Sequence, residues 1–286
     1  MEQRVGASYK PFARLQAVLA RWRVGIILWM LLVAAFLYLG FRWNHLRHRQ
    51  TALDYLLLRR AQLEYAAQST SLWSEILRRV GIAAPFELRS IDLSNSFATD
   101  VDMAQIAAFE ELTTLRLRRA FISARGAAQI GTLRQLTTLD LAGAHIDDAA
   151  LAAMPGQALQ VLDVSDTDIS EASVGVICRW QKLMTLRARD INVSDAALAK
   201  FASLPRLLEL DLSCTKASSE TIEALRTHPR LRFLFLEQCP IADAEMDAIA
   251  ACPSLEWLSI VGTDVGDVGI SRLASCENLT RLMVAR

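Results

Sequence analysis

The chain carries a six-residue pattern, with apolar residues at positions 1, 4 and 6, that returns nine times in register. Its first copy is LRSIDL and its last is LTRLMV, and the nine copies begin at Leu88, Leu112, Leu136, Leu159, Leu183, Leu207, Leu231, Leu255 and Leu279. Successive copies are 24 residues apart, except for one step of 23. A fixed period of about 20–50 residues is the signature of a solenoid, in which each unit packs only on its neighbours.

Each repeat has the pattern of a strand followed by a short helix. Apolar positions 1, 4 and 6 place one face of a strand in the core, while positions 3 and 5 point outward. Position 12 carries residues typical of helix N-caps, and position 13 is often acidic, which favours the first turn of a helix. The N-cap candidates are Thr99, Ser123, Asp147, Ser170, Ser194 and Ser218. We therefore predict an α/β solenoid with nine parallel strands inside and short helices outside.

Two details of the repeat carry their own predictions. The repeat that begins at Leu136 is one residue short around Pro155–Ala158, so we expect a distorted return loop and an intact strand register. Position 9 carries Thr167, Thr215, Cys239 and Thr263. Their short side chains can form hydrogen bonds to the backbone inside the turn, which predicts a structural role.

The pattern LxxLxLxx(T/C)x(I/V)(S/D)(D/E), followed by a short helix, resembles the leucine-rich-repeat family, in its ribonuclease-inhibitor-like class. With an apolar segment before it, the chain is similar to bacterial membrane-anchored leucine-rich-repeat proteins. The resemblance covers residues 71–286 well and residues 1–70 only in architecture. Ile191 and Ala217 depart from the pattern, and position 9 lacks the usual Asn. The resemblance implies binding of a protein or peptide and does not identify the ligand.

Residues 24–41, VGIILWMLLVAAFLYLGF, form a stretch of 18 residues without a charge. As a helix this stretch would be about 27 Å long, close to the roughly 30 Å of a hydrocarbon core. Trp22 and Trp43 flank it as interfacial anchors. A cleaved signal peptide and a buried core helix are the alternatives. No small-residue cleavage site follows, so we expect an uncleaved single-pass transmembrane helix.

The charges of the two parts of the chain differ in sign. Residues 1–85 contain 12 Lys and Arg and 4 Asp and Glu, a net charge of +8, and residues 86–286 contain 19 and 27, a net charge of −8. The basic part suits an anionic membrane surface, and the acidic part argues against nucleic acid as a partner. Five basic residues precede the apolar stretch and five lie within residues 42–60, so the positive-inside rule gives a tie. The short N-terminal tail favours repeats outside the cytoplasm.

These features divide the chain into five segments. We predict a basic tail at residues 1–23, the transmembrane helix at 24–41, a helical juxtamembrane stalk at 42–70 and a lid helix at 71–85, capped by Ser71 and stopped by Gly81. The repeat domain occupies residues 86–286. A solvated stalk and a dimeric coiled coil are both possible for the third segment. The last strand lies two residues before the end of the sequence, so we expect an open C-terminal edge suited to homo-association.

The sequence contains no recognisable catalytic motif. There is no G-x-S-x-G, H-E-x-x-H, Walker A or G-x-G-x-x-G pattern. The recurring Asp residues are explained by helix capping, and the five cysteines follow the repeat, as small buried residues do. We therefore expect no enzyme, no cofactor and no metal site.

The outward positions of the strands line the surface that we name the concave sheet face, where solenoids commonly bind. We predict two zones on it. The charged zone consists of Arg116, Arg118, Asp140, Asp163, Arg187, Arg189 and Asp211. The apolar patch, our predicted partner site, consists of Phe233, Phe235, Trp257, Val261 and Met283. Clustered outward aromatic side chains mark interaction sites more often than ordinary surface does.

Three functions follow as hypotheses. The first is a membrane-anchored protein–protein interaction module that binds a protein or peptide through the concave sheet face and the lipid bilayer through residues 24–41. The alternative is a self-associating scaffold at the membrane. An adaptor for a ubiquitin-ligase-type complex is less favoured, because no recruitment domain is visible.

Overall fold

The computed structural model describes residues 10–65, 88–154 and 156–285, without the side chains of residues 10–28, 42 and 157. The chain divides into a unit over residues 1–51 and a unit over residues 52–286. The predicted lid helix at residues 71–85 lies outside the described residues. So does most of the connection between residue 65 and the first repeat.

Helix α1, Lys10–Leu58, makes up the described part of the first unit and continues into the second. Its apolar side chains from Trp29 to Phe41 are exposed. Among the residues that the structure describes, no helix is long and apolar enough to cross a membrane. The predicted span at residues 24–41 begins within the stretch whose side chains are not described.

The second unit is built on a sheet whose ten described strands follow one another in chain order. The strands are β1 Gln62–Tyr65, β2 Leu88–Asp92, β3 Thr114–Arg116, β4 Thr138–Asp140, β5 Val161–Asp163, β6 Thr185–Arg187, β7 Glu209–Asp211, β8 Phe233–Phe235, β9 Trp257–Ser259 and β10 Arg281–Met283. Strands β2 to β10 are parallel and pair one repeat apart, as Leu186 with Leu210 and Leu210 with Leu234. The nine predicted parallel strands are therefore confirmed.

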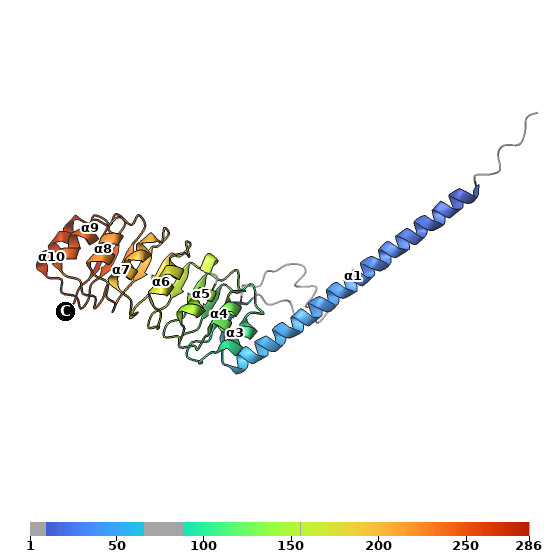
Figure 1. Ribbon diagram of the computed structural model, residues 1–286, viewed down its shortest axis with the longest axis horizontal. Helices are drawn as coiled ribbons and strands as arrows, with labels where there is room; N and C mark the ends of the chain where they lie inside the picture. The colour runs from blue at the N-terminus through green and yellow to red at the C-terminus, as the bar shows by residue number, and fades with distance from the viewer. Residues whose placement is uncertain (1–9, 66–87, 155, 286) are drawn as a thin grey trace, which may run out of the picture. The chain divides into compact units, whose positions relative to one another are not determined.

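Short helices follow the parallel strands and lie one after another along the solenoid (Figure 1). They are α3 Asp100–Ile106, α4 Ala124–Ile130, α5 Asp148–Ala153, α6 Glu171–Ile177, α7 Asp195–Ala199, α8 Ser219–Leu225, α9 Met246–Ala250 and α10 Asp267–Arg272, with 3-10 turns at Gly156–Ala158, Lys200–Ser203, Asp243–Glu245 and Leu273–Ser275. The core lies between strands and helices, where Leu207, Leu210 and Leu212 of one repeat are fully buried.

The predicted N-caps form with one exception. Ser123, Asp147, Ser170 and Ser194 accept hydrogen bonds from backbone N–H groups of the helices they precede. Thr99 forms a capping box with Asp102. Ser218 makes no side-chain cap bond, because the carboxylate of Asp195 from the previous repeat accepts from the backbone of Glu220 and Thr221 instead.

The acidic residues at position 13 connect successive repeats. Asp148 accepts from the backbone N–H of Ser170 at 3.0 Å and from the hydroxyl groups of Ser170 and Ser173. Asp100 and Asp195 bind the next repeat's cap in the same way. The hydrogen bonds from Ser170 and Ser173 hold the pKa of Asp148 below its ordinary value of 3.8. These carboxylates therefore tie one repeat to the next, a role beyond the predicted one.

Of the predictions on repeat details, the intact strand register and the structural role of position 9 are confirmed. Around the short repeat, the return loop becomes a 3-10 turn at Gly156–Ala158, while β4 and β5 keep their register. A Cβ at Gly156 would lie 2.0 Å from the ring of Trp180, so the indole packs directly against this glycine and leaves no room for a side chain there. At position 9, the hydroxyl groups of Thr167 and Thr215 donate to backbone carbonyls three residues earlier at 2.6 Å.

The prediction of a solvated helical stalk over residues 42–70 is wrong at its C-terminal end. Helix α1 stops at Leu58, where Arg60 adopts φ of 59° and the N–H groups of Arg60 and Ala61 bond to the carbonyls of Leu57 and Leu56. This pair of bonds is a Schellman motif. Strand β1 then pairs antiparallel with β2. Because Leu56 is buried in the repeat core, this end of α1 covers the first repeat rather than standing in solvent.

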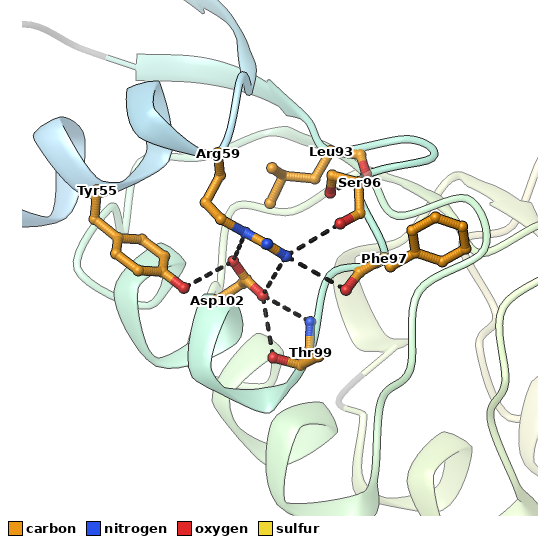
Figure 2. A network of polar contacts seen from close by, with 7 residues as sticks. All are labelled: Tyr55, Arg59, Leu93, Ser96, Phe97, Thr99 and Asp102. Carbon is orange, nitrogen blue, oxygen red and sulfur yellow. Dashed lines mark hydrogen bonds and ion pairs between the residues drawn. The ribbon is translucent and has the colours of Figure 1, made fainter.

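A polar network fixes the end of α1 to the first repeat (Figure 2). The guanidinium of Arg59 donates to Asp102 at 2.9 and 3.3 Å, and to the carbonyl oxygens of Ser96 at 3.1 Å and Phe97 at 3.3 Å. The side chain of Asp102 is fully buried and also accepts from Tyr55 and from the backbone of Thr99. Burial and the nearby Asp102 carboxylate raise the pKa of Tyr55.

Candidate functional site

The strand register places equivalent residues in rows across the concave sheet face. At position 5 the row runs Asp92, Arg116, Asp140, Asp163, Arg187, Asp211, Phe235, Ser259 and Met283. The row at position 3 ends with Glu209, Phe233, Trp257 and Arg281. Both rows therefore change from polar to mainly apolar side chains at β8.

The charged zone is paired internally. Arg118 binds Asp140 at 2.8 Å and lies 3.7 Å from Asp163, and Arg116 lies 3.9 Å from Asp92. Farther along the face, Arg187 binds Glu209 at 2.8 Å and Arg189 binds Glu237 at 3.1 Å. Asp140, Asp163 and Asp211 also each accept a backbone N–H two residues later. Neighbouring opposite charges raise the pKa of Arg118, with the hydrogen bond to Asp140 as the main cause. Much of this charge is therefore neutralised within the face.

Three of the five predicted patch residues form an aromatic cluster. The ring of Trp257 meets Phe235 edge-on at 5.5 Å between centroids and Phe233 at 6.3 Å. Such edge-to-face pairs are favourable by about 0.5–1.5 kcal/mol beyond their buried area. The periodicity predicted that these three side chains point away from the core. Because the rings cover one another, each of them is half-buried and not fully exposed.

Two arginines border the aromatic cluster. The guanidinium of Arg281 lies 4.9 Å from the centroid of Trp257, and that of Arg232 lies 5.4 Å from Phe233. Arg232 also binds Glu256 through two hydrogen bonds of 2.6 Å. The cluster therefore has an apolar centre and a polar rim, the arrangement typical of a binding hot spot.

The remaining patch residues lie beside the cluster and not in it. Met283 is 46% exposed on β10 and is separated from Phe235 in the row by the buried Ser259. Val261 lies half-buried in the turn after β9. The indole N–H of Trp257 is buried without a hydrogen-bond partner among the described residues. The structure thus concentrates the predicted patch on three rings.

Sequence reasoning missed two features. The first is the Arg59–Asp102 network, which joins residues 43 positions apart and has no local signal. The second is an aromatic row formed by Phe97, Phe121 and His145, with Phe121 and His145 stacked at 4.5 Å between centroids. Their spacing of one repeat could have revealed this row, since all three occupy position 10.

The cysteines and metal-binding residue types show no assembled site in the described part of the chain. No group of three or more His, Cys, Asp or Glu side chains there could hold a metal ion. All five cysteines are free, with Cys239, Cys252 and Cys276 buried and the other two half-buried. Burial raises the pKa of Cys252 to about 12, so its thiol stays protonated.

Comparison with known proteins follows from this geometry. A family model described as leucine-rich repeat matches residues 132–154. That match covers the strand β4 and helix α5 of a repeat whose equivalents recur along the second unit. One repeat of this chain therefore matches the leucine-rich-repeat family model, and the described repeat unit has the corresponding fold. A search of curated proteins found no significant match.

Solved leucine-rich-repeat structures resemble the chain in fold. Internalin C2 from Listeria monocytogenes is 20% identical with a TM-score of 0.56, over 69% of this chain and 80% of that one. The ectodomain of the Arabidopsis receptor kinase HAESA, in complex with an IDA peptide hormone, is 20% identical with a TM-score of 0.57. That match covers 85% of this chain and 42% of the receptor chain. At this level of identity the similarity establishes the fold.

Proposed function

We propose that this leucine-rich-repeat protein is not an enzyme but a binding module that takes a protein or peptide partner on its concave sheet face. The cluster of Phe233, Phe235 and Trp257 carries the proposal. It is the place where half-buried aromatic rings, bordered by arginines, replace the paired charges of the earlier repeats. Aromatic and Arg side chains are enriched among residues that dominate binding energy. In the HAESA complex a similar fold is bound to a peptide hormone.

The test compares partner capture by the full chain and by two charge-introducing variants. Wild type, Phe235→Asp and the matched control Val268→Asp would each be used for affinity capture with quantitative mass spectrometry. Val268 is exposed on α10, so its change adds the same charge away from the concave sheet face. We expect Phe235→Asp to lose partners that Val268→Asp retains, since a charge at the centre of the apolar cluster must be desolvated on binding. Equal capture by both variants would refute the assignment of the patch.

We further propose that helix α1 anchors the chain in a membrane, with residues 24–41 as the single span and the repeats outside the cytoplasm. The uncharged stretch of 18 residues and the exposed apolar side chains from Trp29 to Phe41 support this. Extraction of cell membranes with alkaline carbonate should leave the chain in the pellet. Tags at the two termini should then differ in accessibility from outside intact cells. Release by carbonate would contradict the anchor, and an inaccessible C-terminal tag would contradict the orientation.

Self-association is a second candidate, favoured by one observation. Leu282, Met283 and Val284 are 37–46% exposed at β10, the edge strand of the described sheet. Exposed apolar edges are prone to pairing. Light scattering over a concentration series should show an increase in mass that Met283→Asp abolishes. A mass that is independent of concentration would contradict this candidate.

A further inference from the structure

A second exposed aromatic surface lies in the loops that lead from β2, β3 and β4 to α3, α4 and α5. Phe97 and Phe121 are 59% and 46% exposed, and their ring centroids are 6.3 Å apart. His145 stacks on Phe121 with an angle of 12° between the rings, and Val101 of α3 is also exposed. We name Phe97, Val101, Phe121 and His145 the edge patch. Large apolar side chains grouped at the surface mark interaction sites.

The backbone at Phe97 has a strained conformation beside this surface. Its φ is 52°, in the left-handed region, which is unusual for a bulky residue. Position 8 is left-handed in each of the first three repeats, at Asn95, Arg119 and Gly143. Phe97, at position 10 of the first repeat, is left-handed in addition, whereas Phe121 and His145 at the same position are not. Arg59 holds the strained segment by donating to the carbonyl oxygens of Ser96 and Phe97 (Figure 2). Backbone strain of this kind clusters at functional positions.

The edge patch borders an acidic groove of about 550 Å³. Its lining includes Val101, Phe121 and His145 of the edge patch together with Asp100, Asp147 and Asp168. This lining contains three carboxylates and no Lys or Arg. Asp100 is engaged with Ser123, and Asp147 caps α5 through one oxygen. Asp168 is exposed and takes part in no ion pair among the described residues. The groove therefore offers carboxylates beside the stacked rings of Phe121 and His145, whose outer faces are not covered by that stacking.

This combination selects a cationic and planar ligand group. A cation over an aromatic face is attracted by the ring quadrupole, and a guanidinium can also stack on the ring. The same group can bind a carboxylate through two parallel hydrogen bonds. Anionic lipid headgroups and nucleic acid are disfavoured, because three carboxylates would repel their phosphates. We propose that the edge patch binds an Arg side chain of a basic peptide segment in a partner protein, separately from the concave sheet face.

The test measures binding of a fluorescein-labelled peptide, in which Arg alternates with Gly, to the full chain by fluorescence anisotropy. We expect binding that weakens about fivefold or more in Phe121→Ala and in Asp168→Asn, since each removes one part of the recognition. Replacing Arg by Lys in the peptide should also weaken binding, because an ammonium cannot stack or pair through two parallel bonds. Asp168→Asn leaves the rings in place, so it decides the question even if Phe121→Ala perturbs the loop.

Two controls separate this site from other acidic surface and from the proposed function. Asp267→Asn removes one exposed carboxylate from α10, and Trp257→Ala disrupts the concave cluster. Neither should change the affinity for the Arg peptide. An equal loss in Asp267→Asn would mean that net charge alone attracts the peptide. Absence of binding, or tighter binding of a Glu-containing peptide, would also overturn the proposal.

Discussion

At the residue scale, polar side chains in this protein mainly connect one repeat to the next. The carboxylate of Asp148 belongs to α5, yet its hydrogen-bond donors, Ser170 and Ser173, come from the following repeat. Cys239 shows the same principle inside the turn, where its thiol donates to the carbonyl of Leu212 in the preceding repeat. Because each repeat of a solenoid contacts only its neighbours, such links between adjacent repeats determine how cooperatively it unfolds.

Replacing Asp148 by Asn should lower the free energy of unfolding by about 1–2 kcal/mol at pH 7, since charge-assisted hydrogen bonds are lost. The pKa of Asp148 is lowered in the folded chain, so its contribution is present above the ordinary value of 3.8 and lost as pH falls through the folded pKa. Urea unfolding should therefore show a difference between wild type and variant that shrinks as the pH falls below about 4. Asp267→Asn serves as the control, and a difference independent of pH would contradict this explanation.

Substitutions at Trp257 can separate the stabilising contacts of its ring from the cost of its buried N–H group. Its indole N–H lacks an acceptor in the described structure, and such a group costs about 1–3 kcal/mol. Trp257→Phe removes that donor and keeps a ring against Phe233 and Phe235. We expect its unfolding free energy to stay within about 1 kcal/mol of wild type, while Trp257→Ala loses about 3 kcal/mol. Urea titrations of wild type and the two variants measure these free energies of unfolding. Equal decreases for Trp257→Phe and Trp257→Ala would contradict the prediction that removing the donor offsets the lost packing.

At the element scale, the end of α1 and β1 act as the cover of the first repeat. Leu56 enters the core, β1 extends the sheet and Arg59 closes the contact through the buried carboxylate of Asp102. A buried carboxylate requires a partner, because its desolvation is otherwise uncompensated. The helix and strand therefore stabilise β2 and α3 from the side that no earlier repeat covers among the described residues.

Removing the guanidinium of Arg59 should destabilise the first repeat. Arg59→Ala is expected to lower the free energy of unfolding by about 3 kcal/mol, near the low end for one partner of a buried ion pair, because Arg59 itself is 34% exposed. Thermal unfolding followed by circular dichroism would measure the change in Tm. Leu58→Ala, at a side chain that is 85% exposed, is the control and should leave Tm nearly unchanged. Similar Tm values for both variants would contradict a structural role for the network.

At the scale of the whole molecule, the chain combines a long helix with a self-contained repeat unit. The division falls between residues 51 and 52, within α1, so the last turns of this helix belong to the repeats. The two surfaces that we propose for binding belong to different parts of this repeat unit. One consists of rings on the last strands of the sheet, and the other of rings in the loops of the first three repeats.

Truncation tests this division. A fragment of residues 52–286 should unfold cooperatively with the Tm of the repeat unit in the full chain. A fragment of residues 66–286 lacks β1 and the buried Leu56, and we expect its Tm to fall by several degrees, since about 2–5 kcal/mol accompanies loss of one buried Leu. Hydrogen exchange of β2 should become faster in the shorter fragment. Equal Tm values would show that the first repeat needs no cover.

The repeat period by itself determined the solenoid, the nine parallel strands, most helix caps and the rows on the concave sheet face. These follow from local periodicity, because each repeat packs only on its neighbours and the same register recurs. Only the tertiary structure decided where α1 ends, because the left-handed position after the helix is occupied by Arg60 and not by the usual Gly. Likewise, no turn residue typical of a strand boundary predicts β1 at Gln62–Tyr65. The tertiary structure also decided that Phe233, Phe235 and Trp257 shield one another, and that Arg59 donates a hydrogen bond to the carbonyl oxygen of Phe97. Those outcomes depend on side chains from different repeats meeting in space, which periodicity alone does not specify.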